Sequence, residues 1–395
     1  MQTILVINAG SSSLKCTLFR TGQLQEKSIY RFKFSNLLLK PHLSIVDENG
    51  LDRVTKQPDF ASVPKTERHH AALDLVLSWL NTHASQYKLT AFGHRIVHGG
   101  RQFNAPQILS KSDIAHLKEL IPLAPLHQPY NLLLIDCCKK LAPNLPQIAC
   151  FDTMFHHTQM ELERHYALPR KYTEAGIQRY GFHGLSYEYI THQLGQITPK
   201  ACHIKTVMCH LGAGSSMCAI SQGKSIASSM GFTAVDGLPM GTRCGNIDPG
   251  VILYLQRHYN LDCDALEHLI YSESGWLGVS GESSDMLSLK RSQSTSAQEA
   301  INMYAYRIAL ELGRLAAALG GLEQLVFTGG VGENDADLRQ NIIERSRWLG
   351  IHLDEDANVL NASVISNKHS AIPVRVIATN EEAMIAHHVT EIIGD

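Results

Sequence analysis

The sequence lacks the features of membrane, secreted and nucleic-acid-binding proteins. No apolar run approaches the ~20 residues that a membrane-spanning helix needs, and the first residues lack the charged and apolar regions of a signal peptide. Charges nearly balance, with 35 Lys and Arg against 37 Asp and Glu, and the net charge of −2 gives no general attraction to nucleic acid or anionic membranes. The nine cysteines have no metal or disulfide spacing, which indicates reduced thiols. We therefore expect a cytoplasmic protein that binds neither nucleic acid nor membrane.

Several widespread catalytic motifs are missing as well. The sequence contains no HExxH and no GxSxG, and the glycine pairs at 212–214 and 330–332 lack the third glycine of a dinucleotide fingerprint. Gly223-Lys224-Ser225 resembles the end of a P-loop, but Cys218 stands where that motif needs its first glycine. The adjacent histidine pairs show no partnered ligand pattern, so we interpret them as ordinary helix or loop residues.

The stretch around which the chain is organised is its first strand and turn. Ile4–Ile7 form an apolar run typical of a buried strand, and the polar segment Asn8–Ser13 separates it from a second apolar strand that begins near Cys16. The turn offers a carboxamide, hydroxyls, free backbone N–H groups and the ammonium of Lys15, which suit a phosphate chain or a metal-bound phosphate. An ordinary serine-rich hairpin is the alternative interpretation of this stretch alone.

A second copy of this pattern occurs at 206–220. Superimposing Gly10-Ser11-Ser12 on Gly214-Ser215-Ser216 places an apolar strand before and after each turn. Similarity at this wide spacing indicates duplicated domains, and 395 residues are enough for two. The arrangement resembles the sugar kinase/Hsp70/actin superfamily, which implies an α/β fold of two ribonuclease-H-like domains that face a cleft. Helical periodicity and capping residues predict helices over 67–86, 113–121, 130–141, 185–195, 249–259, 262–271, 297–319 and at the C-terminal end.

Charged and polar residues recur where predicted strands end or turn. Arg95 precedes a glycine turn, Asp152 ends the strand at 148–151, and Glu381 follows the strand at 373–379. In open α/β sheets ligands bind beyond the carboxyl ends of the strands. Each residue alone is more often a surface or ion-paired side chain, but together they supply cations for a phosphoryl group and oxygens for Mg²⁺.

Eight motifs in order along nearly the whole chain resemble those of the acetate kinase family, which includes propionate and butyrate kinases. The motifs are Asn8–Lys15, His94–Gly100, Phe151–His156, Arg179–Gly184, His210–Gly212, Met240–Arg243, Thr328–Asn334 and Thr379–Glu382. The resemblance implies a phosphotransferase with a carboxyl acceptor that reversibly transfers phosphoryl from ATP to acetate, giving ADP and acetyl phosphate by direct in-line transfer. It also implies Mg²⁺, for which Mn²⁺ could substitute, and a homodimer.

The same resemblance assigns residues to roles and to domains. It implies a domain 1–151, completed by a helix at 383–395, and a nucleotide-binding domain 152–382. Catalysis falls to Arg95, Asp152, His183 and Arg243, the metal to Asn8 and Glu381, and the substrate to Arg95, Val97, Leu126, His127 and Phe182. The nucleotide would lie along Ser11, Ser13, Lys15, His210, Leu211, Gly212, Ala213, Gly214, Asp285, Met286, Leu287, Gly330, Val331, Gly332, Glu333 and Asn334.

Four positions depart from the family pattern and leave alternatives open. Ala234 replaces a usual proline beside the acyl pocket, where room for a methylene would change discrimination by only ~1–3 kcal/mol. Propionate or butyrate kinase activity is therefore an alternative. Ala213 stands where the family often has Asn, and Leu287 stands where it usually has Arg, so the contacts with the nucleotide remain open. Arg101 stands where an acidic residue is common. Rivals of other classes are a non-catalytic nucleotide switch of the actin/Hsp70 type and an acyl phosphatase.

Overall fold

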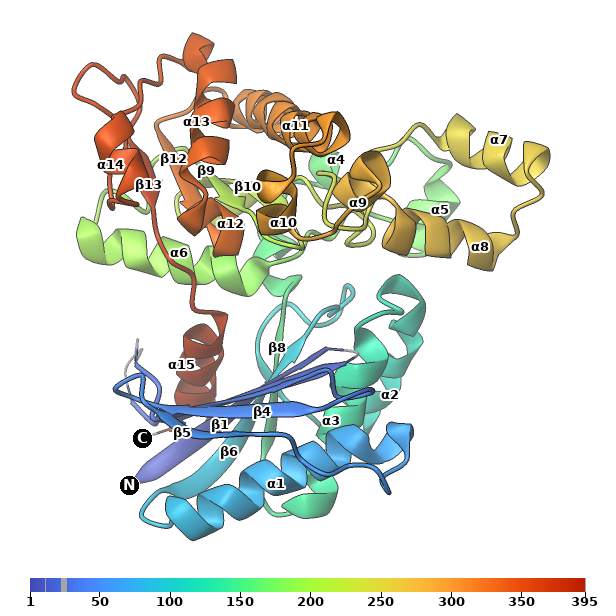
Figure 1. Ribbon diagram of the computed structural model, residues 1–395, viewed down its shortest axis with the longest axis vertical. Coiled ribbons are helices and arrows are strands. Elements are labelled where there is room, and N and C mark those ends of the chain that lie inside the picture. The colour runs from blue at the N-terminus through green and yellow to red at the C-terminus, as the bar shows by residue number, and fades with distance from the viewer. Residues whose placement is uncertain (11, 23–26, 395) are drawn as a thin grey trace. The chain divides into compact units, whose positions relative to one another are not determined.

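The computed structural model describes residues 1–10, 12–22 and 27–394, so Ser11, a predicted nucleotide residue, lies outside the described residues. The chain divides into two compact units. Unit 1 comprises Met1–Met154, Gly184–Tyr189 and the chain from Asn380 onward, and unit 2 comprises Phe155–His183 and Ile190–Thr379. Each unit contains one sheet and its covering helices (Figure 1).

The sheet of unit 1 combines an antiparallel meander with parallel strands. Its order is β5-β4-β3-β2-β1-β6-β8-β7, in which β1 to β5 pair antiparallel in sequence, β1, β6 and β8 run parallel, and β7 is antiparallel to β8. The bounds are β1 Gln2–Gly10, β2 Ser13–Arg20, β3 Tyr30–Ser35, β4 His42–Asp47, β5 Asp52–Lys56, β6 Lys88–Ile96, β7 Gln107–Ile108 and β8 Gln147–Phe151.

Helices cover both faces of this sheet. Phe92 of β6 packs in one core cluster with Leu73 of α1 (Arg68–His83) and Leu134 of α3 (Gln128–Leu141). The next residue, Gly93, points to the opposite face, where an added Cβ would lie 2.7 Å from Ile385 of α15 (Glu381–Ile393). The remaining helices of the unit are α2 Lys111–Glu119 and the 3₁₀ turns η1 Lys65–Glu67 and η2 Ile121–Leu123.

The sheet of unit 2 repeats the central part of the first sheet. Its order is β11-β10-β9-β12-β13, with three antiparallel strands followed by two parallel ones. The strands are β9 Thr206–His210, β10 Ser216–Ser221, β11 Lys224–Ser228, β12 Gln324–Thr328 and β13 Val374–Val376. Because β3-β2-β1-β6-β8 has the same order and directions, the predicted duplication of a ribonuclease-H-like domain is confirmed.

One long helix builds the core of unit 2. α11 (Thr295–Leu319) is capped by the Ser294 hydroxyl, ends at Gly320 with φ +63°, and packs its apolar face on β9 and β10. α7 (Pro249–His258) and α8 (Cys263–His268) form a helical pair away from that core (Figure 1). The other elements of this unit are α4 Glu161–Arg164, α5 Arg170–Glu174, η4 Leu269–Glu273, α9 Gly275–Ser280, α10 Met286–Arg291, α12 Gly329–Asn334, α13 Ala336–Arg345, η5 Arg347–Leu349 and α14 Glu355–Val359. Two elements, η3 Met154–Thr158 and α6 Gly184–Ile197, begin in unit 1 and continue in unit 2.

The two hairpin turns differ more than their sequences indicate. β1 continues to Gly10, which pairs with Ser13, whereas β9 ends at His210 and a longer loop precedes Ser216. The predicted superposition of Gly10 on Gly214 therefore matches a strand end to a loop residue. In the second loop the Ser215 hydroxyl bonds to the Gly212 backbone and to the Tyr304 hydroxyl of α11, which ties the loop to that helix.

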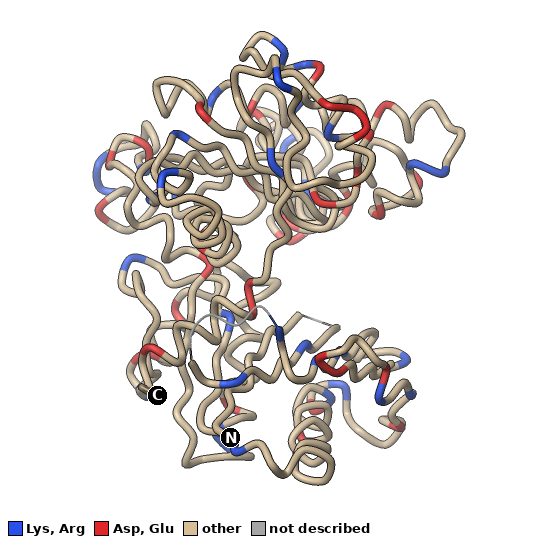
Figure 2. The backbone as a smooth tube through the Cα atoms, turned by 90° about the vertical axis from the view of Figure 1, so that its left-hand side faces the viewer, with Lys and Arg blue, Asp and Glu red and all other residues tan. Residues whose placement is uncertain are grey.

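Two further features bear on partners. Among the described residues, no helix is both long and apolar enough to cross a membrane. Lys and Arg are interspersed with Asp and Glu along the chain of both units (Figure 2).

Candidate active site

In unit 1 the site is built at the carboxyl ends of the three parallel strands. Asn8 lies near the end of β1, Arg95 near the end of β6, and Asp152 directly after β8. Because β1 pairs with β6 and β6 with β8, the three side chains come from neighbouring strands. The sequence therefore predicts this edge of the sheet correctly as a place where polar groups gather.

Arg95 and Asp152 form a two-pronged ion pair. The Arg95 Nε and Nη2 atoms donate to the two Asp152 carboxylate oxygens at 2.9 and 2.6 Å, and the Asp152 side chain is only 2% exposed. Burial lowers the pKa of the Arg95 guanidinium, but the carboxylates of Asp152 and Glu381 outweigh this effect and raise it. Arg95 is thus a permanently charged, oriented cation whose Nη1 side remains directed toward Asn8, 3.5 Å from its Oδ1.

Side-chain oxygens that could coordinate a metal ion lie close to the Arg95 guanidinium. Glu381 is the first residue of α15, and the Asn380 side chain caps this helix by accepting from the Ala383 N–H. The Glu381 Oε2 atom lies 3.6 Å from Arg95 Nε. Lys15 pairs with Asn8 across the hairpin and is exposed, and Ser13 begins the returning strand. In the described part of the chain, no group of three or more His, Cys, Asp or Glu forms a ready-made metal cage. A carboxamide and one or two carboxylates are instead the sparse oxygen set with which proteins hold hydrated Mg²⁺.

Two buried amides that the sequence did not single out support the segment after Arg95. The Asn131 Oδ1 atom accepts from the Val97 N–H at 3.1 Å, and Gln128 bonds to both the N–H and the C=O of His98. Val97 is buried, whereas Leu126 is 40% exposed on the loop before α3, where His127 precedes the first helical residue. Both amides lie one helical turn apart on α3, which is the only sequence signal that could have identified them.

In unit 2, His183 occupies an uncommon backbone conformation. Its φ of +56° lies in the left-handed region, which a non-glycine residue adopts only when its surroundings hold it there. The His183 Nδ1 atom lies 2.8 Å from the Ser216 hydroxyl, and its ring stacks on His210 with centroids 4.3 Å apart. The structure therefore brings together two predicted residues and adds Ser216, which was not predicted.

His156 holds the residue before His183. Its Nε2–H donates to the Phe182 carbonyl at 2.9 Å, because a carbonyl only accepts, and Nδ1 then accepts from the Ser225 hydroxyl at 2.9 Å. Burial lowers the pKa of His156 to about 4, so the ring is neutral at ordinary pH. The ring covers Gly181, where an added Cβ would meet it at 2.6 Å. The prediction that His156 is an ordinary loop histidine missed this fixed position beside Phe182.

Arg243 lies near His183, beside Gly214. Its Nη1 donates to the Ala234 carbonyl at 3.0 Å, and a Cβ added at Gly214 would be 3.5 Å from His183 Nε2 and 3.9 Å from Arg243 Nη1. Gly214, His183, His210 and Arg243 therefore form one cluster within unit 2. Ala213, beside Gly214, is exposed, and its carbonyl accepts from the Gly241 N–H.

Backbone hydrogen bonds join Leu211, the predicted nucleotide residue directly after β9, to the predicted nucleotide residues of α12. The Leu211 carbonyl accepts from the N–H groups of Val331 and Gly332. Glu333 Oε1 accepts from the backbone of Gly329 at 2.8 Å and of Thr379 at 3.1 Å, whereas Asn334 donates to the exposed Gly330. Glu333 thus stabilises the start of α12 through its own contacts.

The third predicted nucleotide segment is the start of α10. Asp285 caps this helix by accepting from the Ser288 N–H and hydroxyl, Met286 is buried in the core, and Leu287 is 63% exposed. Asp285 and Leu287 are both exposed, and Leu287 stands at the position where the family usually has arginine.

Comparisons with known proteins agree with one another over the full chain. The model of the Acetokinase family matches residues 3–387. An acetate kinase of Rhodopseudomonas palustris is 46% identical over 391 residues, covering 98% of this chain and 97% of the relative. The crystal structure of Porphyromonas gingivalis acetate kinase superimposes with a TM-score of 0.87, at 35% identity and with complete coverage of both chains. A propionate kinase structure from Francisella tularensis has a TM-score of 0.90 at 34% identity, covering 98% and 99% of the two chains. This chain belongs to the acetokinase family.

Proposed function

We propose that this chain reversibly transfers the γ-phosphoryl group of ATP to acetate, forming acetyl phosphate and ADP. Membership of the acetokinase family and the names of its relatives support this reaction. The observation that carries it is the Arg95–Asp152 pair at the carboxyl ends of the neighbouring parallel strands β6 and β8. Such a fixed cation suits an anionic acceptor that must approach a polyanionic donor.

The reaction needs charge stabilisation more than proton transfer. A carboxylic acid with a solution pKa near ~4–5 is already ionised at neutral pH, so its attack requires no strong general base. The Asp152 carboxylate is engaged by Arg95 through both oxygens, and we assign it to orienting that guanidinium. Arg95 and Arg243 would bind the carboxylate and the transferring phosphoryl group, and His183, fixed by Ser216, would donate to the phosphoryl oxygens. A positioned arginine can contribute ~10³–10⁵ in rate to such transfers.

Mg²⁺ fits the oxygen donors of unit 1. Asn8 and Glu381 would hold it, both close to Arg95, and Mn²⁺ accepts the same oxygen ligands. When bound, the ion would neutralise part of the phosphate charge. Lys15 and Ser13, together with Ser11, would bind phosphate oxygens, and the loops at 211–214, 285–287 and 330–334 would bind the nucleotide.

Propionate is the second candidate substrate. Ala234 stands where the family usually has proline, and the propionate kinase of Francisella tularensis shares the fold over nearly the whole chain. Val97, Leu126 and Phe182 would line the acyl pocket. An extra methylene changes selectivity by only ~1–3 kcal/mol, so a single small residue is enough to shift the preference.

We also propose a homodimer that forms through α7. None of the residues of α7 is buried, although Val251, Leu253 and Tyr254 are apolar and 41%, 48% and 57% exposed. Apolar side chains that the described part of the chain leaves uncovered are typical of an interface.

The test is acyl phosphate formation from ATP and Mg²⁺ with acetate, propionate or butyrate, trapped as the hydroxamate. We expect the highest kcat/KM with acetate. A preference for propionate would move the assignment within the family. ATP binding without hydroxamate from any acid would contradict the proposed reaction and favour a nucleotide switch.

A further inference from the structure

We propose that Tyr166 and Arg179 hold the two ends of the segment Phe232–Asp236 and thereby position Arg243 and the acyl-pocket residue Ala234. We call these two side chains the clamp. The inference rests on the proposed function, because it assigns positioning residues to the acyl side of that reaction. All of the residues involved belong to unit 2.

The segment matters because its middle residue orients Arg243. The Ala234 carbonyl accepts from Arg243 Nη1 at 3.0 Å. The same residue occupies the position beside the acyl pocket where the family usually has proline. A displacement of this backbone would therefore move both a phosphoryl-binding cation and a determinant of acyl length.

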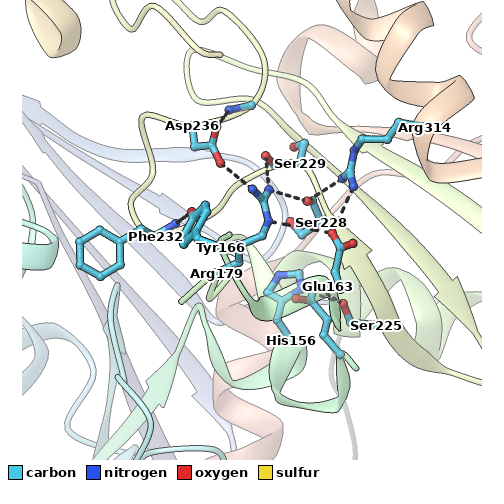
Figure 3. Close-up of polar contacts among 12 residues, drawn as sticks. His156, Glu163, Tyr166, Arg179, Ser225, Ser228, Ser229, Phe232, Asp236 and Arg314 are labelled. Atoms are coloured by element: carbon cyan, nitrogen blue, oxygen red, sulfur yellow. Dashed lines mark hydrogen bonds and ion pairs between the residues drawn. The ribbon is translucent and has the colours of Figure 1, made fainter. Parts of the chain in front are cut away.

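Tyr166 holds the first end of the segment. Its hydroxyl oxygen accepts from the Phe232 N–H at 2.9 Å (Figure 3). Burial raises the pKa of Tyr166, so the hydroxyl stays protonated and neutral. The Arg179 guanidinium lies over the Tyr166 ring at 5.8 Å from its centroid, which links the two members of the clamp.

Arg179 holds the second end and ties it to the sheet. Its Nη1 donates to Asp236 Oδ2 at 3.1 Å, and its Nη2 donates to the carbonyls of Ser228 and Ser229 at 3.2 and 3.1 Å (Figure 3). Ser228 ends β11. The planar guanidinium can bond in these directions at once, whereas a lysine ammonium cannot reproduce the fork.

Arg179 is in turn linked to α11 through Glu163 and Arg314. Glu163 Oε1 lies 4.0 Å from Arg179 Nε and 3.1 Å from Arg314 Nη1, and Arg314 donates to the same Ser228 carbonyl at 2.8 Å. Arg314 is also paired with Glu311 of α11. The ion pairs therefore connect the segment to the main core helix.

Gly231 supplies an independent indication that the clamp is closed. A Cβ at this position would lie 2.3 Å from Asp236 Oδ2, 2.4 Å from Tyr166 Oη and 3.2 Å from Arg179 Nη1. A side chain at residue 231 would therefore displace the polar ends of both members of the clamp, which converge on this backbone position. A general surface ion pair would not require this closeness.

The decisive experiment compares Tyr166→Phe with Tyr180→Phe. Both variants lose one tyrosine hydroxyl bonded to backbone, but Tyr180 bonds to the Gly176 carbonyl, outside the clamped segment. For Tyr166→Phe we expect kcat/KM for acetate to fall about tenfold, since small misplacements of a positioning group have such effects. The KM for ATP should change less than twofold, and the acetate-to-propionate selectivity ratio should change at least threefold. Arg179→Lys should show the same pattern more strongly.

Hydrogen exchange separates the failure of the clamp from the failure of the proposed reaction. Backbone amides at 231–236 should exchange faster in Tyr166→Phe than in the wild type, and Tyr180→Phe should leave them unchanged. Faster exchange in a chain that forms no acyl phosphate would support the physical clamp while rejecting the reaction. Unchanged exchange, or equal losses with all substrates and with both variants in an active enzyme, would overturn the proposal.

Discussion

Both carboxylate oxygens of Asp152 accept hydrogen bonds from Arg95, and Glu381 lies 3.6 Å from the same guanidinium. Asp152→Asn keeps the side-chain shape but removes the charge and one acceptor, so Arg95 can turn toward Glu381. We expect kcat for acyl phosphate formation to fall about 100-fold, because the guanidinium loses its orientation. The KM for ATP should stay within twofold. Initial rates with hydroxamate trapping measure both quantities.

The matched control for this change is Asp47→Asn. Asp47 is also a buried aspartate paired with an arginine of unit 1, since its Oδ2 accepts from Arg53 at 2.7 Å, but it lies at the end of β4. That variant should lose stability and keep kcat. Equal kcat values for wild type and Asp152→Asn would show that the pair serves only the fold.

The residue types of this site are predictable from the sequence, whereas their hydrogen-bond partners are not. Asn8 and Asp152 follow predicted strands and Arg95 lies near the end of one, so their common edge could be expected. Their hydrogen bonds could not, because they depend on the register between β1, β6 and β8. Asn131 and Gln128 were missed for a related reason: an amide on an ordinary helix carries no local signal of the backbone group that it will meet.

At the scale of elements, α6 belongs to two units, and a buried histidine explains part of this. Its residues Gly184–Tyr189 belong to unit 1, where Glu188 Oε2 lies 3.0 Å from His388 Nε2 of α15 and Glu391 Oε2 lies 3.5 Å from His388 Nδ1. Burial lowers the pKa of His388, but the hydrogen bond and charge of Glu188 outweigh it and raise the pKa above 6.5.

This raised pKa predicts a pH-dependent stability. A histidine with a raised folded pKa stabilises fully below its unfolded value, and the effect is lost as pH rises through the folded value. We therefore expect the Tm difference between wild type and His388→Gln to be about 3 °C larger at pH 6 than at pH 9. His116→Gln, on the exposed surface of α2, should show no such difference. A gap that is constant with pH would mean that the ring acts only through packing.

Long elements were predictable from sequence, and short ones were not. The periodicity at 297–319 agrees with α11, and the Ser110 capping box marks the start of α2. α9 and α12 were not recognised, because they contain glycines and are only six residues long. Tertiary contacts hold them, as when the Leu211 carbonyl accepts from Val331 and Gly332. The predicted helix at 262–271 becomes α8 followed by the π-helical segment η4.

At the scale of the molecule, the chain passes between its units at four points, and three of these are close to proposed site residues. Asp152 lies just before the passage at 154–155, His183 lies at the passage at 183–184, and Glu381 follows the passage at 379–380. The duplication was readable from the repeated hairpin. The contribution of 184–189 to unit 1 was not, because it depends on contacts such as that of Glu188 with His388.

The proposed dimer is the prediction that belongs to the whole molecule. Leu253→Asp places a charge next to Tyr254 among the exposed apolar residues of α7, where burial against a second copy would desolvate it at high cost. We expect the variant to be monomeric in light scattering at concentrations where the wild type is dimeric. Its unfolding temperature should change little at low protein concentration, because Leu253 is already 48% exposed in the single chain.

Leu360→Asp provides the control for a charge introduced on an exposed leucine. Leu360 is 79% exposed and directly follows α14, so it is not part of α7. This variant should therefore remain dimeric. If Leu253→Asp also remains dimeric, α7 is not the interface and its apolar residues need another explanation. If it becomes monomeric and keeps its kcat, each copy carries a complete site. A monomer that loses kcat while Leu360→Asp retains it would instead show that dimer formation orders the loops that α7 follows, including the one that carries Arg243.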